Sequence, residues 1–380
     1  MATKEKLGAV RAQIDTIDTQ LIGLFRQRMQ LADEAAKIKS EGNISLLDER
    51  RESEVVERAV AEVPADLKGE TAAFFRSLMG LSKSRQRKFL YGTSEEYFFP
   101  APEQPKEGDV KVAFQGVPGA WGEMAALQLF KTPELCSQED FEDVFIAVKD
   151  KRTAYGVVPI ENSQTGGIGE VHDLLRKYGC YIVGQTWVEV EHCLMAAPGT
   201  GLDDVREVLS HPEGFKQCRK FLRGRAWDLT ACRNTAVAAE TVSKRGDRRT
   251  AAIGSARAAQ LNGLSVLARD IADDSSNRTR FILIAAAPEY DETCDRVSVI
   301  FRTAHRAGAL CDVLLPFLSE GINMSRLESR PTSESGKYCF FCDLEGNMQD
   351  ERMQSALRQA AACSGYLDVL GCYRKDTEKR

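Results

Sequence analysis

The sequence predicts a multidomain chain of 380 residues, with an all-α domain, then an α/β domain, then an α+β domain of ferredoxin-like order. Three observations predict this division. Apolar residues recur every three or four positions near the N-terminus, as in amphipathic helices. Residues 91–109 are acidic, contain prolines and lack periodicity, which is typical of a linker. Short strand patterns then alternate with helical ones. We therefore place the three domains at residues 1–90, 110–288 and 295–375.

The composition favours a cytoplasmic protein that acts on small molecules. The net charge of -5 argues against nucleic acid or an anionic membrane as a partner. No apolar run approaches the roughly 20 residues of a membrane span, and the N-terminal M-A-T-K-E-K-L lacks the apolar core of a signal peptide. The 11 cysteines are odd in number and scattered. In the one C-x-x-C, Cys339 and Cys342 would face opposite sides of a strand, so we expect buried reduced thiols and no metal site.

Arg28 occupies a position of the apolar stripe on the first predicted helix. An unpaired buried charge is costly, so either an anion meets the guanidinium there, or Arg28 forms a structural ion pair or extends to solvent. The stripe consists of Leu7, Val10, Ile14, Ile17, Leu21, Leu24, Leu31, Ala35 and Ile38.

Two further cations, Arg11 and Lys39, lie on one edge of the same stripe. Lys39 is three turns from Arg28, roughly 16 Å along the axis, so both side chains can converge on one small anion. Arg11 lies roughly 42 Å from Lys39, which is too far for one small molecule. If Arg11 shares the site, it comes from a second chain, and the sequence then predicts an antiparallel helical dimer with two equivalent sites.

Further polar groups follow at helical spacing and complete a family pattern. The strings V-R-A-Q-I, R-x-x-L-A, K-I-K, D-E-R-R-E and S-x-x-x-Q resemble the all-helical chorismate mutases, whose three helices form an intertwined dimer. The polar residues of the last two strings are Asp48, Arg51 and Glu52 on one face and Ser82 and Gln86 on a third helix.

The resemblance implies a rearrangement of chorismate to prephenate that needs no nucleophile, metal or cofactor. Catalysis then consists of holding a dicarboxylate in its reactive conformer and stabilising charge on the breaking ether oxygen. By resemblance, the partner chain's Arg11 and this chain's Arg28 clamp the carboxylates with help from Arg51, Lys39 and Gln86 donate to the ether oxygen, and Asp48, Glu52 and Ser82 orient the substrate.

Beyond the linker, short strand patterns alternate with helical ones, as in an α/β domain. Its first strand runs into G-V-P-G-A-W-G, Gly116–Gly122, and then into a helix. A glycine turn that opens a helix can bind an anion, but this string is neither G-x-G-x-x-G nor a Walker motif, so the loop alone favours tight packing. The predicted strands are Val110–Gln115, Ala154–Val158, Tyr181–Val190, Val205–Leu209, Ala251–Ile253 and Phe281–Ala285.

Three polar strings lie where α/β domains place their ligands, at strand ends. V-V-P-I-E-N-S ends a buried strand, S-H-P-E-G-F-K-Q-C follows another, and N-R-T-R-F enters the last strand. Each alone also fits a capped helix or an ordinary turn. Together they resemble prephenate dehydratase, which implies a two-lobed, periplasmic-binding-protein-like fold with its site in the cleft.

The family's reaction expels carbon dioxide and a ring hydroxyl from prephenate to give phenylpyruvate. By resemblance Thr279 donates to the leaving hydroxyl, as one link of a hydrogen-bonded relay. The loop of Gly122 and Glu123, where many relatives carry serine and histidine, is assigned only a shaping role. By resemblance Asn162, Ser210 and Gln217 bind the substrate beside Ser163, Glu161 positions the loop, and Arg280 either binds a carboxylate or braces the strand.

The C-terminal segment has the order strand, helix, strand, strand, helix, strand, and resembles the ACT sensor domains of dehydratases that respond to phenylalanine. A helix N-terminus and a strand end can hold the charged groups of an amino acid. The predicted effector residues are Gly308, Ala309, Leu310, Glu328, Ser329, Arg330 and Pro331. The predicted elements are Val297–Thr303, Ala309–Leu318, Met324–Arg330, Tyr338–Leu344, Glu351–Cys363 and Tyr366–Tyr373.

The order mutase, dehydratase, sensor is that of the bacterial bifunctional chorismate mutase/prephenate dehydratases. The resemblance implies a homodimer or a higher homo-oligomer that acts on chorismate and prephenate under feedback by phenylalanine. Two other classes stay open: a solute-binding module, against which the Thr279 string and the absence of a signal peptide argue, and a dehydratase that prefers arogenate.

Overall fold

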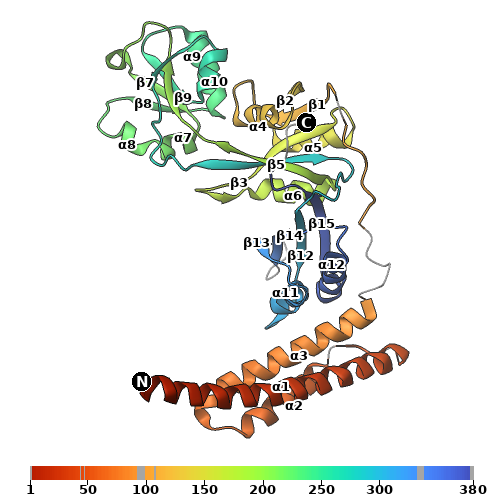
Figure 1. The fold of residues 1–380 in the computed structure, drawn as a ribbon. Helices are drawn as coiled ribbons and strands as arrows, with labels where there is room; N and C mark the ends of the chain where they lie inside the picture. The colour runs from red at the N-terminus through yellow and green to blue at the C-terminus, as the bar shows by residue number, and fades with distance from the viewer. Residues whose placement is uncertain are drawn as a thin grey trace.

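The computed structural model describes residues 2–42, 44–46, 48–91, 99–106, 108–331 and 338–376. The chain forms a helical module, a two-sheet α/β module and a C-terminal α+β module, and the C-terminal module lies between the other two (Figure 1). Within the described residues, no helix combines the length and the apolar character needed to cross a bilayer.

The helical module contains three α-helices, with α1 and α2 packed against α3. Among the residues of α1 whose burial is described, Met29, Ala32 and Ala36 are buried. The large apolar residues of the predicted stripe are instead between 46% and 63% exposed, so a single chain does not bury that stripe. The elements are α1 Ala2–Glu41, α2 Glu49–Ala61, the 3-10 turn η1 Ala65–Leu67 and α3 Lys68–Tyr91.

The first lobe of the α/β module is a mixed sheet in the order β2-β1-β3-β11-β5, with β4 paired to β3. Its strands bury an almost continuous apolar set, as expected for a sheet covered by helices. The elements are β1 Lys111–Gln115, α4 Trp121–Leu129, β2 Glu134–Gln138, α5 Phe141–Lys149, β3 Tyr155–Asn162, β4 Gly166–Gly167, α6 Gly169–Tyr178, β5 Tyr181–Glu189 and β11 Arg278–Ala285.

The second lobe is a sheet in the order β10-β6-β9-β7-β8. The chain enters it after β5 and returns before β11, so two crossing segments join the lobes and the two-lobed prediction is confirmed. The elements are β6 Cys193–Ala196, η2 Leu202–Asp204, β7 Glu207–Ser210, α7 Pro212–Gln217, α8 Arg219–Leu222, β8 Asp228–Ala231, α9 Thr235–Arg245, β9 Thr250–Gly254, α10 Ala256–Leu261 and β10 Ser265–Ala268.

The C-terminal module has the predicted order and an antiparallel sheet, β13-β14-β12-β15, which is the ferredoxin-like arrangement. Its two helices share an apolar core with one face of the sheet, and the other face joins the core of the first lobe. Cys342 belongs to the former cluster and Cys339 to the latter, which confirms that they face opposite sides. The elements are β12 Arg296–Arg302, α11 Ala309–Ser319, β13 Met324–Pro331, β14 Tyr338–Glu345, α12 Glu351–Cys363 and β15 Tyr366–Tyr373.

The helical module is joined to the C-terminal module through α3, which packs on α11 and α12. Ser84 Oγ donates to Gln359 Oε1 at 3.3 Å, and Lys88 Nζ lies 2.6 Å from Glu320 Oε1. The described linker residues 99–106 form no helix or strand, whereas residues 92–98 and 107 of the predicted linker lie outside the described residues.

Candidate active sites

The first candidate site lies where α1 crosses α3. Arg28 is half-buried, and its Nη1 donates to the carbonyl of Leu78 at 3.2 Å and to the hydroxyl of Ser82. Burial lowers the pKa of the Arg28 guanidinium. A cation in a partly dry site, bonded to one hydroxyl and one carbonyl, can still attract an anion.

Two more predicted residues of this site carry polar atoms without a charged partner. Gln86 lies one turn beyond Ser82 on α3 and is buried, and its Oε1 has no hydrogen-bond partner among the described residues. Lys39 is half-buried on α1, and its Nζ donates to the carbonyl of Leu46 at 3.0 Å. The Gln86 amide thus lies one turn from the Ser82 that contacts Arg28, whereas the Lys39 ammonium lies roughly 16 Å farther along α1.

The start of α2 supplies the remaining polar groups. Asp48 caps this helix, since its Oδ1 accepts from the backbone N–H of Arg51 at 2.9 Å. The Arg51 guanidinium is exposed and lies 3.8 Å from Glu54. Glu52 points toward α3, where Lys83 Nζ lies 3.0 Å from its carboxylate.

Lys83 escaped the sequence analysis, although it follows Ser82 directly. Its side chain is only 10% exposed, and its Nζ also lies 3.8 Å from Asp312 at the start of α11. In the sequence, Lys83 cannot be distinguished from a solvent-exposed lysine of an amphipathic helix. Its burial depends on the packing of α11 on α3, which the sequence does not reveal. Lys83 thus ties a residue of the candidate mutase site to the C-terminal module.

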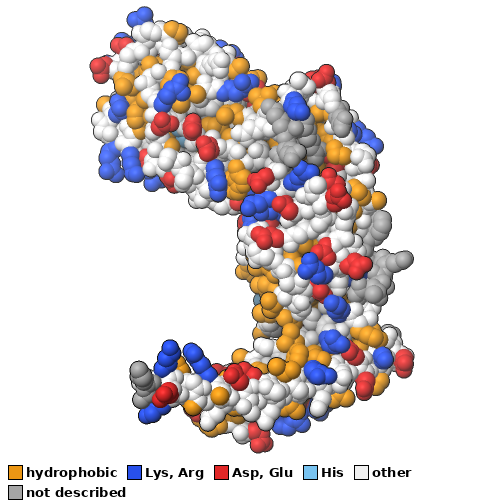
Figure 2. All heavy atoms as spheres, viewed as in Figure 1, with side chains coloured by type: hydrophobic (Ala, Val, Ile, Leu, Met, Phe, Trp, Pro, Cys, Tyr) orange, Lys and Arg blue, Asp and Glu red, His pale blue; other side chains and the backbone are white. Residues whose placement is uncertain are grey.

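Arg11 is exposed and stands alone in the single chain. It precedes Arg28 by about 26 Å along the rod of α1, so the single chain does not bring the two together. Exposed apolar side chains cover the same helix, and orange patches are visible on the surface of the helical module in Figure 2.

The second candidate site lies at the ends of β3 and β11, beside the crossings between the lobes. Asn162 Nδ2 donates to Thr279 Oγ1 at 2.9 Å and to Asn277 Oδ1 at 2.9 Å. Asn162 Oδ1 accepts from the backbone N–H groups of Gln164 and Thr165 at 3.0 and 3.2 Å. Since every polar atom of the Asn162 amide is engaged, the amide fixes the position of the Thr279 oxygen.

The other predicted dehydratase residues hold the surrounding backbone. Ser163 pairs with Arg278, whose backbone N–H donates to the serine hydroxyl at 3.0 Å. Ser210 is fully buried at the end of β7 and donates to the carbonyl of Ile253 at 3.0 Å. Gln217 Oε1, on the second lobe, lies 2.8 Å from His192 Nε2.

His192 and Trp121 are further polar and aromatic groups here that the sequence analysis missed. His192 stands on the crossing into β6, and burial lowers its pKa, so its ring is neutral near pH 7. Trp121, at the start of α4, meets the imidazole edge to face with ring centroids 5.9 Å apart. The string E-H-C directly before a short apolar strand was the available signal.

The glycine loop joins the two lobes. Glu123 Oε2 accepts from the backbone N–H of Gly119 at 2.8 Å and from Arg257 Nε of the second lobe at 2.8 Å. Ser255, also of the second lobe, donates to the carbonyl of Gly119 at 2.8 Å. These contacts are in line with the shaping role expected for the loop.

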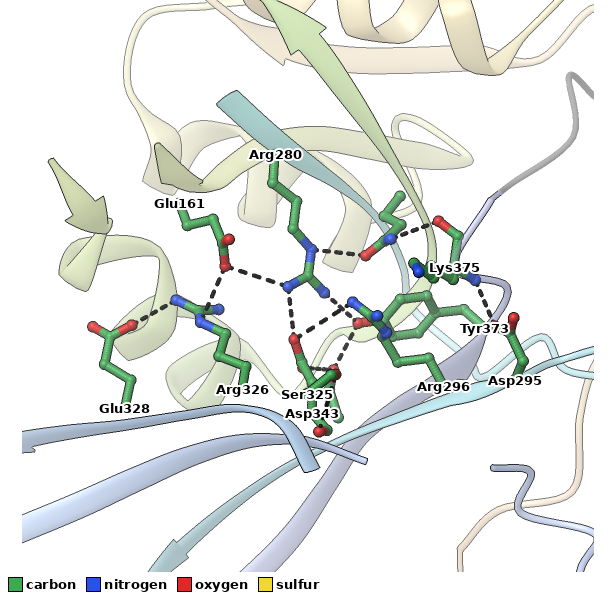
Figure 3. A network of polar contacts seen from close by, with 12 residues as sticks. Glu161, Arg280, Asp295, Arg296, Ser325, Arg326, Glu328, Asp343, Tyr373 and Lys375 are labelled. Carbon is green, nitrogen blue, oxygen red and sulfur yellow. Dashed lines mark hydrogen bonds and ion pairs between the residues drawn. The ribbon is translucent and has the colours of Figure 1, made fainter. Parts of the chain in front are cut away.

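Arg280 and Glu161 point toward the C-terminal module, where they contact Asp343 and Arg326 (Figure 3). Burial alone would lower the pKa of the Arg280 guanidinium, but the neighbouring Tyr373 and Asp343 outweigh it and raise that pKa. Burial likewise opposes ionisation of Asp343, yet the charge of Arg280 holds the pKa of this carboxyl below its ordinary value. The ion pair is therefore fully charged at neutral pH.

The predicted effector residues fall into two groups in the single chain. Gly308, Ala309 and Leu310 open α11, which packs against α12 and α3. The strip Glu328–Pro331 ends β13, where Ser329 and Pro331 are exposed. A Cβ at Gly167 would collide with the Glu328 carboxylate, and one at Gly169 with the Arg330 guanidinium, so both charged side chains pack on the first lobe.

Fold and sites together define a class of enzyme, with a helical module that holds a half-buried cation at a helix crossing and a two-lobed module that joins polar side chains where β3 ends and β11 begins. The family model for chorismate mutase type II matches residues 10–87, and that for prephenate dehydratase matches residues 112–289. The chain belongs to the bifunctional chorismate mutase/prephenate dehydratase family and carries both enzyme domains.

Three relatives illustrate this membership. The bifunctional chorismate mutase/prephenate dehydratase of Enterobacter agglomerans is 32% identical over 96% of this chain and 95% of its own length. Arogenate dehydratase/prephenate dehydratase 1 of Arabidopsis thaliana is 35% identical over 81% of this chain and 80% of its own length. The structure of the Arthrobacter aurescens prephenate dehydratase in complex with L-Phe matches with 30% identity and a TM-score of 0.64, over 70% of this chain and 92% of that chain.

Proposed function

We propose that this enzyme converts chorismate to phenylpyruvate at two separate sites, the first at the α1–α3 crossing and the second beside Thr279, and that phenylalanine inhibits the second step. We assign the mutase domain to residues 1–90, the dehydratase domain to 110–288 and an ACT sensor domain to 295–375.

In the proposed mutase site, Arg28 binds one carboxylate of chorismate, and Arg51 assists. The observation that carries this assignment is the contact of the Arg28 guanidinium with Ser82, which lies one helical turn before Gln86 on α3. Lys39 and the Gln86 amide donate to the ether oxygen as its bond breaks, and Asp48 and Glu52 orient the hydroxyl of the substrate. A unimolecular rearrangement needs only this positioning and charge stabilisation.

The second carboxylate is bound by the partner subunit's Arg11 in a dimer formed through α1. The exposed apolar stripe of α1 supports a second copy as its cover, because contiguous exposed apolar surface marks an interaction site. The dimer that we propose is antiparallel along α1, so it contains two equivalent mutase sites.

In the proposed dehydratase site, Thr279 passes its hydroxyl proton to the leaving ring hydroxyl and regains a proton from solvent, as one link of a hydrogen-bonded relay. The hydrogen bond from Asn162 carries this proposal: because the amide donates to Thr279 Oγ1, the threonine's own hydrogen is directed elsewhere, toward the cleft. Loss of carbon dioxide leaves an electron pair that forms the aromatic ring as the hydroxyl departs with the proton, giving water. Gln217 contacts the substrate from the second lobe, and the fully buried Ser210 holds the end of β7 through its bond to the carbonyl of Ile253.

One assay tests both sites. Chorismate incubated with the purified full-length enzyme should yield phenylpyruvate without any added cofactor. Arg28→Ala should abolish consumption of chorismate but leave turnover of supplied prephenate intact, and Thr279→Ala should stop the reaction at prephenate. A Thr279→Ala enzyme with undiminished dehydratase turnover would reject the proposed second site.

Phenylalanine is the proposed effector of the C-terminal module. Its ferredoxin-like topology and the Gly308–Leu310 and Glu328–Pro331 strings support this assignment, as does the relative whose structure was solved with L-Phe. Since these two strings lie on different sides of a single module, we place the pocket between modules of two subunits.

Arogenate is the second candidate substrate, because the Arabidopsis relative is named for both arogenate and prephenate. Arogenate carries an amino group where prephenate has a ketone. Comparing kcat/KM for the two compounds decides between them: a higher value with arogenate would make this chain an arogenate dehydratase.

A further inference from the structure

Asn162 and Thr279 of the proposed dehydratase site each have a charged neighbour in the chain, Glu161 and Arg280. In the pairing of β3 with β11, Asn162 lies opposite Thr279 and Glu161 lies opposite Arg280. Because side chains alternate along a strand, Glu161 and Arg280 face the opposite side of the sheet from the proposed catalytic pair. That side is covered by the C-terminal module.

Both charged side chains end on partners from the C-terminal module (Figure 3). Arg280 Nη1 lies 2.6 Å from Asp343 Oδ2 on β14, and its Nη2 donates to the Tyr373 hydroxyl at 2.8 Å. Glu161 Oε2 lies 3.0 Å from Arg326 Nε on β13. Each residue beside the proposed catalytic pair therefore has its own counterion in another module.

The arrangement around Arg280 is closed and rigid. Arg280 is 3% exposed, and its Nε donates to Gln185 Oε1 at 2.7 Å, so the guanidinium has partners on three sides. Asp343 is itself held by the hydroxyl of Ser298, which lies 2.7 Å from the Tyr373 hydroxyl. Removal of Asp343 would leave a buried cation without its main counterion, and the surrounding backbone would have to adjust.

The backbone at this point is irregular in a way that makes it sensitive to that adjustment. The pairing of β3 with β11 shifts register between Arg280 and Phe281, directly after Thr279. A bulge re-aims the side chains next to it. The unpaired residue is Ile160 on β3, directly before Glu161, so the ion pairs of Glu161 and Arg280 lie at the bulge and next to Asn162 and Thr279.

Arg326 also connects to the strand end that we assign to the effector. Its Nη2 lies 2.5 Å from Glu328 Oε2, so this one guanidinium is shared between Glu161 and Glu328. The Glu328 carboxylate packs on Gly167, which is paired with Glu161 in the β3–β4 hairpin. Side chains of the C-terminal module thus contact both the β3–β4 hairpin next to Asn162 and the residue of β11 next to Thr279.

We propose that Arg326 and Asp343, from the C-terminal module, are positioning residues of the dehydratase reaction: through Glu161 and Arg280 they set the geometry of Asn162 and Thr279. This inference rests on the proposed dehydratase site. Arg280 then acts as a brace of the strand and leaves the carboxylates of the substrate to other groups.

The test uses full-length Arg326→Gln and Asp343→Asn enzymes, with Arg352→Gln as the matched control. Arg352 pairs with Asp350 at the start of α12, in the same module but on an exposed surface. We expect kcat for prephenate to fall by about 10-fold to 100-fold in both test variants, with a much smaller change in KM, since misplacement by about 1 Å is that costly. The control should retain wild-type kcat.

The mutase activity of the same preparations reports on folding. It should stay at the wild-type level in all three variants, because the ion-pair partners of these residues within the described part of the chain lie outside the helical module. Arg326→Lys should recover most of kcat, and the double variant Glu161→Gln/Arg326→Gln should be no slower than the slower of its two single variants.

Two outcomes would overturn the inference. One is a lower melting temperature in Arg326→Gln with kcat unchanged, since a merely structural ion pair predicts that result. The other is full additivity of Glu161→Gln and Arg326→Gln. If Thr279→Ala keeps its dehydratase activity, the proposed site itself fails, and that failure is distinct from both.

Discussion

The amide of Asn162 donates to the hydroxyl oxygen of Thr279 across 2.9 Å, and this bond joins the end of β3 to the start of β11. It occupies the acceptor side of the threonine and leaves the hydroxyl hydrogen for the substrate. The bond also spans the point at which the chain re-enters the first lobe, so the threonine is held at a junction and not on a free loop.

Asn162→Ala should therefore mimic much of the loss seen in Thr279→Ala. We expect kcat for prephenate to fall by at least about 100-fold, the range of one general-acid contribution, and Thr279→Ser to stay within about tenfold of wild type. Steady-state formation of phenylpyruvate measures this. A Thr279→Ser enzyme as slow as Thr279→Ala would argue that the methyl group, and not the hydroxyl, is needed.

Lys83→Met should slow the mutase and leave the dehydratase unchanged. The substitution removes the cation that neutralises Glu52 in a nearly dry place, so that carboxylate is free to move and to repel the dianionic substrate. We expect kcat/KM for chorismate to fall by about tenfold. Lys88→Met is the matched control, because Lys88 pairs with Glu320 at the same junction but is exposed. Equal effects of the two variants would contradict a role near Glu52.

Ile14→Glu should separate the proposed dimer and abolish mutase turnover. Ile14 is 49% exposed on the α1 stripe, and a carboxylate there cannot be buried against a second copy. Sedimentation velocity should show a smaller species, with prephenate turnover retained. Leu229→Glu is the control, since Leu229 is also 49% exposed but lies on β8 of the second lobe. An intact oligomer with full mutase activity in Ile14→Glu would reject the α1 interface.

Glu328→Gln and Arg330→Gln should weaken inhibition by phenylalanine. We expect the inhibitory concentration to rise by at least about fivefold, which is the lower end of a typical allosteric coupling. Dehydratase assays over a series of phenylalanine concentrations measure it, with the exposed Glu351→Gln as the control. Unchanged inhibition in both test variants would place the pocket elsewhere.

His172 should make the junction of the α/β and C-terminal modules sensitive to acid. Burial, together with the charges of Arg326 and Arg330, lowers the pKa of His172 to about 3 from an ordinary value of 6.5. Below pH 6.5 the unfolded chain binds a proton that the folded chain refuses, so stability falls as the pH falls. The loss is about 1.4 kcal/mol per pH unit, or about 2 kcal/mol near pH 5.

The corresponding measurement is urea unfolding at about pH 7.5 and about pH 5, followed for wild type and His172→Asn. Asparagine does not titrate, so the variant should lose about 2 kcal/mol less than wild type between the two conditions. An identical loss in both proteins would show that His172 is protonated in the folded state.

Local patterns accounted for most of the elements. The strands β3 and β11 were predicted from their apolar runs, but as Ala154–Val158 and Phe281–Ala285, so the polar ends with Asn162 and Thr279 lay outside the predicted bounds. The short strands β2, β6, β8 and β10 were missed, since runs such as C-L-M-A of β6 contain too few residues for a period to be recognised. The helical stripe was predicted as a buried seam, but one chain alone leaves it exposed.

The contacts between modules could not be predicted in the same way. Glu161 and Arg326 belong to separate strand patterns, and only the docking of two modules brings them to 3.0 Å. The alternation in β13 did carry a partial signal, because it places Arg326, Glu328 and Arg330 on one face. For Arg280 the sequence left two roles open, and its contacts with Asp343 and Tyr373 favour the brace.

The place of the C-terminal module between the other two also determines the order in which contacts form during synthesis of the chain. Ser84 of α3 bonds to Gln359, a residue added to the nascent chain 275 positions later. At about 5–20 residues per second, α3 leaves the ribosome roughly 14–55 s before its partner helix exists. The helical module is therefore made long before its partner surface, and its junction with the C-terminal module closes only after α12 has been synthesised.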